Sequence, residues 1–223
     1  MRRLVVFDID DTLYLERDYV RSGFAAVGAW AGAELGVADL GDRAWARFEA
    51  GGRGRIFDEV LAASGVRANG SLVSQLVGVY RSHAPAIEML DDVRAWLAAR
   101  PDDLALAVVS DGPPASQRAK AVALGLGDWA DPIVLTEELG PGRGKPHPAA
   151  FARVEAATGV AGPACAYVAD NPAKDFAGPR CRGWRTVRVR RDGGLHAGVA
   201  SGDDVDAEIT GFASLDEALG RWA

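Results

Sequence analysis

Cysteine and histidine are scarce in this chain of 223 residues. The two cysteines, Cys165 and Cys181, form no C-x-x-C pair, and the three histidines, His83, His147 and His196, have no partners at the spacing of metal ligands. These absences exclude a disulfide scaffold, a cysteine-based zinc site and a dithiol redox motif. Two isolated cysteines fit a reducing compartment, so we expect a cytoplasmic protein.

Long apolar runs are also missing. The first apolar run, residues 4–7, ends at Asp8 and is too short for the core of a signal peptide. No segment approaches the roughly 18 apolar residues of a membrane span. The formal net charge is −6, so no overall attraction draws the chain to nucleic acid or to an anionic membrane. We expect neither as a partner, and any anionic ligand must be bound by a local site.

Short apolar runs are present, and they predict the strands of a parallel sheet. The expected strands are residues 4–7, 104–110, 132–135, 164–169 and 184–189. Helical patterns lie between the later strands, at residues 114–124, 148–158 and 173–181. This alternation predicts an α/β fold, a Rossmann-like doubly wound parallel sheet.

A helical segment interrupts this alternation. Amphipathic patterns predict short helices at residues 20–35, 44–49, 56–63 and 72–80, and no strand is expected among them. We therefore expect two domains: a core formed by residues 1–15 and 91–223, and an inserted helical domain formed by residues 16–90.

Three aspartates follow the first strand within four positions: Asp8, Asp10 and Asp11. In an extended chain, residues two apart point to the same side, so Asp8 and Asp10 are expected to face one cavity. Asp11 then faces away, and we expect it to be solvated or to cap a helix. Two carboxylates on one side repel each other, so the arrangement needs a cation, a shared proton or a nearby lysine.

Further polar residues follow the next strands. They are Ser110, Asp111 and Gly112 after the second strand, Lys145 after the third, and Asp170 and Asp175 after the fourth. In doubly wound sheets the loops at the carboxyl ends of the strands form the ligand site, so these residues should converge. Carboxylate oxygens suit Mg²⁺. With a metal and a phosphate neutralising it, one carboxylate can act as a nucleophile that forms an aspartyl-phosphate.

These residues resemble the four motifs of the haloacid dehalogenase superfamily in order and spacing. The motifs are DIDDT from Asp8 to Thr12, Ser110 in VVSDG, Lys145 in GKPHPAAF, and Asp170 and Asp175 in VADNPAKDF. The likeness covers over half of the chain. It implies a Rossmann-like hydrolase core with a helical cap, residues 16–90, inserted after the first motif.

The resemblance also implies roles for the motif residues. Asp8 would be the nucleophile, and Asp10 the acid that protonates the leaving group and then the base that activates water. Lys145 would offset the charge on Asp8 and on the phosphoryl group. Phosphate oxygens would be bound by Ser110, Asp111, Gly112 and Lys145. Mg²⁺ would be held by Asp8, the carbonyl of Asp10 and Asp170, with Thr12 and Asp175 in support.

Asp10 distinguishes between the reactions of this superfamily. Dehalogenases typically lack the second aspartate, because a halide leaves without a proton, whereas an alkoxide needs one. The sequence therefore predicts a Mg²⁺-dependent phosphatase of a small soluble phosphomonoester, such as a nucleoside monophosphate or a sugar phosphate. A phosphotransferase or mutase that uses the same aspartyl-phosphate, and a phospho-ligand-binding protein without turnover, are the alternatives.

A basic run near the C-terminal end has a different explanation. Its arginines are Arg180, Arg182, Arg185, Arg188, Arg190 and Arg191. Arg188 and Arg190 alternate with Val187 and Val189. This pattern predicts an edge strand with a solvated, charged face, and nucleic-acid binding is not expected.

Overall fold

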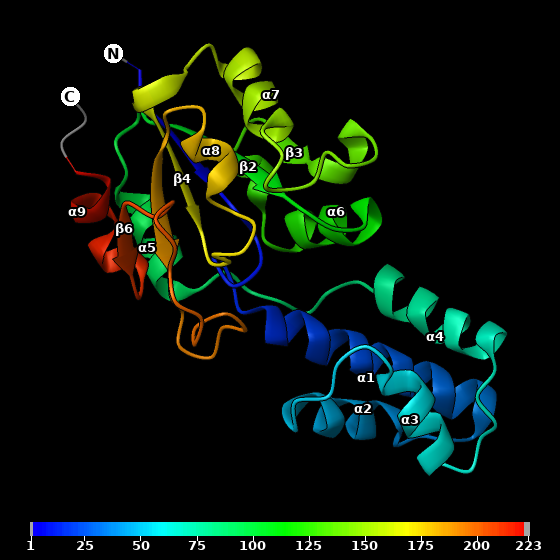
Figure 1. The fold of residues 1–223 in the computed structure, drawn as a ribbon. Helices are drawn as coiled ribbons and strands as arrows, with labels where there is room; N and C mark the ends of the chain where they lie inside the picture. The colour runs from blue at the N-terminus through cyan, green and yellow to red at the C-terminus, as the bar shows by residue number, and fades with distance from the viewer. Residues whose placement is uncertain (1, 221–223) are drawn as a thin grey trace. The chain divides into compact units, whose positions relative to one another are not determined.

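The computed structural model describes residues 2–220, which fall into two compact units. Among the described residues, one unit comprises residues 2–17 and 88–220, and the other comprises residues 18–87 (Figure 1). These limits lie within three residues of the division expected from the sequence, 1–15 and 91–223 for the core and 16–90 for the insert. Residue 1 and residues 221–223 of the expected core lie outside the described residues.

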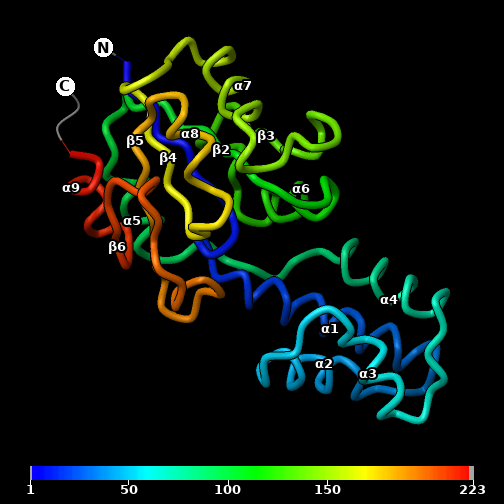
Figure 2. Tube along the Cα trace, viewed as in Figure 1, coloured from blue at the N-terminus to red at the C-terminus, as the bar shows by residue number. Residues whose placement is uncertain are grey.

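The first unit, called the core unit below, is built on a parallel sheet of six strands in the order β3-β2-β1-β4-β5-β6. The strands are β1 Leu4–Phe7, β2 Ala105–Ser110, β3 Ile133–Leu135, β4 Cys165–Ala169, β5 Arg185–Val189 and β6 Ala207–Ile209. The expected α/β fold is confirmed, and its first five strands lie where the apolar runs placed them, to within a residue. Figure 2 follows the chain through these crossovers.

Buried residues fill both faces of the central strand β1. Leu4 and Val6 belong to a cluster that includes Phe151 of helix α7 (Ala149–Thr158). Phe7 points to the other face, where its ring lies 5.6 Å from Trp96 of α5 (Asp91–Ala99) and 5.5 Å from Phe212. Alternation along the strand thus places helices on both faces, as a doubly wound sheet requires. Three further α-helices belong to this unit: α6 Pro114–Ala123, α8 Ala177–Arg180 and α9 Leu215–Leu219.

The expectation that the fifth strand forms the edge of the sheet is wrong. Strand β6 pairs in parallel with β5 outside it, with Arg188 opposite Glu208. Arg188 is fully buried. Its guanidinium donates to the carbonyls of Asp170, Val199 and His196 and to the hydroxyl of Ser201. Arg188 therefore lies in the interior of the unit, hydrogen-bonded to backbone carbonyls, and not on a solvated face of the strand.

The second unit, called the helical unit, contains most of α1 Glu16–Leu35, together with α2 Leu40–Glu49, α3 Ile56–Ala63 and α4 Gly70–Ser82. A cluster of apolar side chains contributed by all four helices forms its interior, including Phe24, Leu40, Leu61 and Leu76. The backbones of α1 and α2 approach closely at Gly41, where an added Cβ would lie 2.3 Å from the carbonyl oxygen of Phe24. Within residues 2–220, no helix has the length and apolarity to cross a bilayer.

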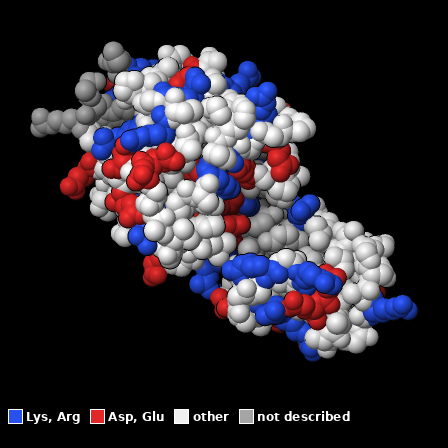
Figure 3. Space-filling model, in the orientation of Figure 1, with Lys and Arg blue, Asp and Glu red and all other residues white. Residues whose placement is uncertain are grey.

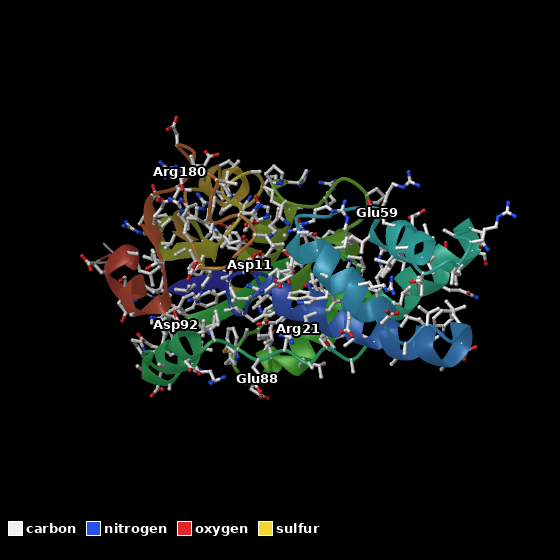
Figure 4. All side chains as sticks on the ribbon, turned by 90° about the horizontal axis from the view of Figure 1, so that it is seen from below. Asp11, Arg21, Glu59, Glu88, Asp92 and Arg180 are labelled. Atoms are coloured by element: carbon white, nitrogen blue, oxygen red, sulfur yellow. The ribbon has the colours of Figure 1, made fainter. Side chains whose placement is uncertain are left out.

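Charged side chains of both signs are interspersed over the face of the molecule drawn in Figure 3. Several arginines of the basic run form ion pairs. Arg182 pairs with Glu155, Arg180 with Asp206, and Arg190 with Glu208. Arg191 pairs with Asp92, which is labelled in Figure 4.

Candidate active site

The expected site residues meet beyond the carboxyl ends of the central strands. Asp8 follows β1 directly, Ser110 ends β2, and Asp170 follows β4 directly. Lys145 lies in the connection between β3 and α7. Parallel strands bring their carboxyl ends to one edge, and buried apolar residues hold these strands in register. The fold therefore brings together polar residues that are far apart in the sequence.

Lys145 is the cation at the centre of the site. Its side chain is fully buried, and its Nζ lies 2.9 Å from Oδ1 of Asp8 and 2.7 Å from Oδ1 of Asp175. The ammonium also donates to the hydroxyl of Tyr167 at 3.0 Å. Burial would lower the pKa of Lys145, but the two carboxylates raise it well above its usual 10.5. Lys145 is therefore a fixed positive charge.

Three buried carboxylates lie close together, and two of them pair with this cation. Asp8, Asp170 and Asp175 each offer an oxygen within 4.8 Å of the others. Burial, opposed by Lys145, raises the pKa of Asp8 to about 6. Burial and the charges of Asp8 and Asp175 raise the pKa of Asp170 to about 9. One lysine does not balance three carboxylates, so the cluster has an affinity for added positive charge.

This cluster suits a divalent metal ion. Among residues 2–220, no hydrogen bond or ion pair to the carboxylate of Asp170 is present, although its side chain is buried. A buried carboxylate without a partner is costly unless a cation or a proton neutralises it. Hard oxygen ligands in this number fit Mg²⁺ with water and substrate oxygens completing its coordination. Asp8 and Asp170 are therefore suitable metal ligands.

Replacing Asp170 by asparagine is expected to stabilise the metal-free protein. The pKa of Asp170 is about 9 in the fold against an ordinary 3.8, so the folded state binds more protons and the free energy of unfolding falls as pH rises between these values. In EDTA at about pH 8, Asp170→Asn should raise the free energy of unfolding by up to about 5 kcal/mol, since each pKa unit between the ordinary value and pH 8 corresponds to about 1.4 kcal/mol. Mg²⁺ should raise the melting temperature of the wild type but not of the variant.

Thermal denaturation with EDTA or with Mg²⁺ checks this expectation, with Asp203→Asn as the control because Asp203 is an exposed acid. The control should melt like the wild type under both conditions. An Asp170→Asn protein with an unchanged response to Mg²⁺ would contradict the metal assignment.

Asp10 is held by a different set of residues from Asp8. Lys120 of α6 places its Nζ 2.6 Å from Oδ1 of Asp10. Tyr14 donates its hydroxyl to the same oxygen, and Gln117 donates to Oδ2 at 3.3 Å. Burial would raise the pKa of Asp10, but the Lys120 ammonium lowers it below its usual 3.8. Each of the two adjacent carboxylates thus has its own lysine, which removes the need for a shared proton.

Asp11, labelled in Figure 4, is buried and not solvated. Its φ of 50° lies in the left-handed region, which aspartate tolerates better than most residues. Its carboxylate accepts the backbone N–H of Glu16, the first residue of α1, and that of Leu195. The expectation of a solvated residue is therefore wrong, and the contact with Glu16 is that of a helix-capping side chain.

The loop after β2 carries the residues expected to bind phosphate. Ser110 donates its hydroxyl to Gln117 at 3.0 Å. The carboxylate of Asp111 accepts the hydroxyl of Thr136 and, at 3.1 Å, the backbone N–H of Lys145. Asp111 thus anchors the loop that presents Lys145. Because a carboxylate repels phosphate, only the backbone of Asp111 suits a phosphate contact. Gly112 has a φ of +122°, where a residue with a Cβ would be strained.

Thr12 has no link to the site through its hydroxyl, which is buried without a hydrogen-bond partner among the described residues. Its carbonyl accepts Nε and Nη2 of Arg191 at 3.3 and 2.9 Å. Asp175 does contact the site, since it pairs with Lys145 and accepts the backbone N–H of Asn171 at 2.8 Å. Asp175 therefore orients Lys145 and the loop that follows β4.

The sequence pattern missed Tyr14, Gln117, Lys120 and Lys174. A signal for two of them was available in the composition. The chain has 22 arginines and only three lysines, Lys120, Lys145 and Lys174. Each of the three approaches a carboxylate of the site, the last placing Nζ 3.5 Å from Oδ2 of Asp111. In a chain that otherwise uses arginine, each lysine marks the site.

Comparisons with known proteins give matches over most of this chain. A family model described as haloacid dehalogenase-like hydrolase matches residues 2–181. Phosphoserine phosphatase of Thermus thermophilus is 30% identical, over 85% of this chain and 89% of its own. Glyceraldehyde 3-phosphate phosphatase of Methanopyrus kandleri is 29% identical, over 94% and 93%. The crystal structure of 2-haloacid dehalogenase from Pseudomonas syringae pv. tomato has a TM-score of 0.67 and 26% identity, covering both chains completely.

Proposed function

Because the chain belongs to the haloacid dehalogenase-like hydrolases, we propose that it is a phosphoric monoester hydrolase that works through an aspartyl-phosphate. One observation carries the proposal: Asp8 and Asp10 are two residues apart yet are held by different lysines, Lys145 and Lys120. Two carboxylates in different environments can take different roles, one as nucleophile and one as acid and base. The phosphatase names of two relatives support the same reaction class.

The first step forms a bond between a carboxylate oxygen of Asp8 and phosphorus. The bond from phosphorus to the ester oxygen breaks, and Asp10, in its protonated form, donates its proton to the departing alkoxide. Burial favours this form, but the Lys120 ammonium lowers the pKa of Asp10 below its usual value. The protonated form is therefore a minor species near neutral pH and a stronger acid than an ordinary aspartic acid. In the second step Asp10 takes a proton from water, whose oxygen attacks phosphorus and releases Asp8 and inorganic phosphate. Lys145 holds the attacking carboxylate in place through the 2.9 Å ion pair.

Asp8, the carbonyl of Asp10 and Asp170 would hold Mg²⁺, with Asp175 orienting Lys145 beside them. When bound, Mg²⁺ supplies positive charge that reduces the repulsion between this acidic cluster and an incoming phosphate. Ser110 and the backbone at Gly112 would contact the phosphate oxygens. We assign the choice between different phosphate esters to the helical unit. The enzyme is assigned to the cytoplasm, a location that the free thiols of Cys165 and Cys181 support.

Dehalogenation is the competing reaction, since the 2-haloacid dehalogenase noted above has a similar structure. A halide leaves without a proton, so a dehalogenase has no use for a second carboxylate beside the nucleophile. In this chain Asp10 is present and is bound by a lysine, a tyrosine and a glutamine. These contacts favour an ester whose leaving group must be protonated.

The test is release of inorganic phosphate from a panel of esters in ¹⁸O-labelled water. The panel contains O-phosphoserine, glyceraldehyde 3-phosphate, nucleoside monophosphates, sugar phosphates and p-nitrophenyl phosphate, with 2-chloropropionate as the dehalogenase substrate. We expect ¹⁸O in the released phosphate, loss of activity with EDTA and recovery with Mg²⁺. Chloride release, transfer of phosphate to a second organic product, or ligand binding without release would each contradict the proposal and identify the alternative.

A further inference from the structure

Helix α6 buries three polar side chains, Ser116, Gln117 and Lys120, and the last two contact the same carboxylate. Gln117 and Lys120 are three residues apart, so they project from neighbouring turns on the same side. Both are buried, whereas Arg118 on the same helix is exposed and pairs with Glu138. Lysine is among the residues least often buried, because its ammonium loses hydration unless a partner compensates. The burial of Lys120 therefore requires a specific partner.

That partner is the carboxylate of Asp10, and its two oxygens are bound separately. Oδ1 accepts the ammonium of Lys120 at 2.6 Å and the hydroxyl of Tyr14. Oδ2 accepts the amide of Gln117 at 3.3 Å. Donors on both oxygens fix the position of the carboxylate and the rotation of its plane. A single ion pair would fix only the distance.

Gln117 connects Asp10 with the loop after β2. Its Oε1 accepts the hydroxyl of Ser110 at 3.0 Å while its Nε2 donates to Asp10. The amide oxygen accepts a hydrogen bond and the amide nitrogen donates one, and this difference fixes the orientation of the amide. One side chain of α6 therefore links the residue expected to transfer the proton with a residue expected to bind the phosphate.

The geometry points to Lys120 as a positioning residue that, with Gln117, holds the carboxylate of Asp10 in line for proton transfer to the leaving group. We call these two side chains the α6 brace, and the inference rests on the proposed function. The side chain of Asp10 is 19% exposed, whereas that of Lys120 is 4% exposed. Water can reach Asp10, so solvation of its charge does not demand a buried lysine. Hydrogen-bond donors at fixed positions hold the carboxylate in one orientation, which mobile water molecules cannot do, and catalysis requires such an orientation.

Two aryl esters of similar shape test the inference. Phenyl phosphate has a basic leaving group that needs a proton, whereas p-nitrophenolate leaves with little assistance. Lys120→Met should lower kcat about 100-fold for phenyl phosphate and no more than about 10-fold for p-nitrophenyl phosphate. KM should change less than about threefold for either ester, because the brace acts on proton transfer and not on binding.

Matched variants separate positioning from general damage. Arg118→Met removes a cation from the same helix and should leave the rates with both esters unchanged, because Arg118 is exposed and pairs with Glu138 instead of with Asp10. Gln117→Met removes the other half of the brace without changing charge, and should show the same preference for the better leaving group. Where Lys120→Met does not fold, Gln117→Met carries the test.

A double-mutant cycle provides the second readout. If Lys120 acts through Asp10, then Lys120→Met should have little further effect in an Asp10→Asn protein, measured with p-nitrophenyl phosphate. Equal losses for both esters, or single losses that multiply in the double variant, would overturn the inference. A wild type that releases no phosphate from either ester would instead refute the proposed function, and the inference would fall with it.

Discussion

Asp8→Asn is expected to abolish phosphate release, with a loss in kcat of at least about 10⁴-fold, while the protein stays folded. The amide has nearly the shape of the carboxylate, but its oxygen is a poor nucleophile. Burial raises the pKa of Asp8 to about 6, so the charged form is disfavoured in the fold. Removing that charge from a crowded acidic cluster should cost little stability, and the melting temperature should be equal to that of the wild type or higher.

Rapid acid quenching makes this result specific to the nucleophile. The wild type, mixed with a labelled phosphate ester and quenched within one turnover, should carry label in an acid-stable, hydroxylamine-sensitive acyl phosphate. Asp8→Asn should carry none. Asp102→Asn removes an exposed carboxylate and serves as the control, with full activity and full labelling. Retention of a tenth of the activity by Asp8→Asn would refute Asp8 as the nucleophile.

Lys145→Met should be the most destabilising single change in the site. It removes the ammonium that lies 2.9 Å from Asp8 and 2.7 Å from Asp175. Breaking a buried ion pair on one side typically costs about 3–5 kcal/mol, because the remaining charge stays desolvated. We expect a loss of this size near neutral pH, measured by urea denaturation in EDTA, together with loss of phosphatase activity.

The pH dependence of that loss identifies its cause. Without Lys145 the folded carboxylates should bind protons more tightly than the unfolded ones, so the deficit in the free energy of unfolding should shrink as pH falls towards about 4. Arg180→Met removes one member of an exposed ion pair with Asp206, and it should cost no more than about 1 kcal/mol at any pH. A deficit for Lys145→Met that is independent of pH would indicate lost packing instead of unpaired charge.

The sequence was sufficient to predict the grouping of Asp8, Lys145 and Asp170. Apolar runs located the strands, and the rule that ligand sites form at the carboxyl ends of parallel strands grouped the loops. Both steps depend on local patterns that repeat along the chain. The fold class follows from the same patterns, because the apolar runs predicted the parallel sheet that the structure has. The family match is consistent with this fold.

Other features depend on contacts that no local pattern reveals. Strand β6 has only three residues, one of them Glu208, so it lacks an apolar run and was not expected. The left-handed turn at Asp11 directs its carboxylate inward, against the alternation expected for an extended chain. Lys120 lies 110 residues from Asp10, and the amphipathic pattern of its helix does not distinguish it from a surface lysine. The pairing of each aspartate with a lysine could not be derived from spacing alone.

The buried guanidinium of Arg188 has a consequence for the loop between β5 and β6. Its Nε donates at 2.9 Å to the carbonyl of Asp170, while Nη1 and Nη2 donate at 2.8 Å to the carbonyls of Val199 and His196. Main-chain carbonyls accept these bonds, so the identities of the loop side chains matter less than the path of the backbone. Most side chains of the loop should therefore tolerate substitution, except Ser201, whose hydroxyl also accepts from Nη1, and His196, whose ring contacts Asn171. A change in loop length should be tolerated less, because it would move the carbonyls that hold the guanidinium bonded to the carbonyl of Asp170.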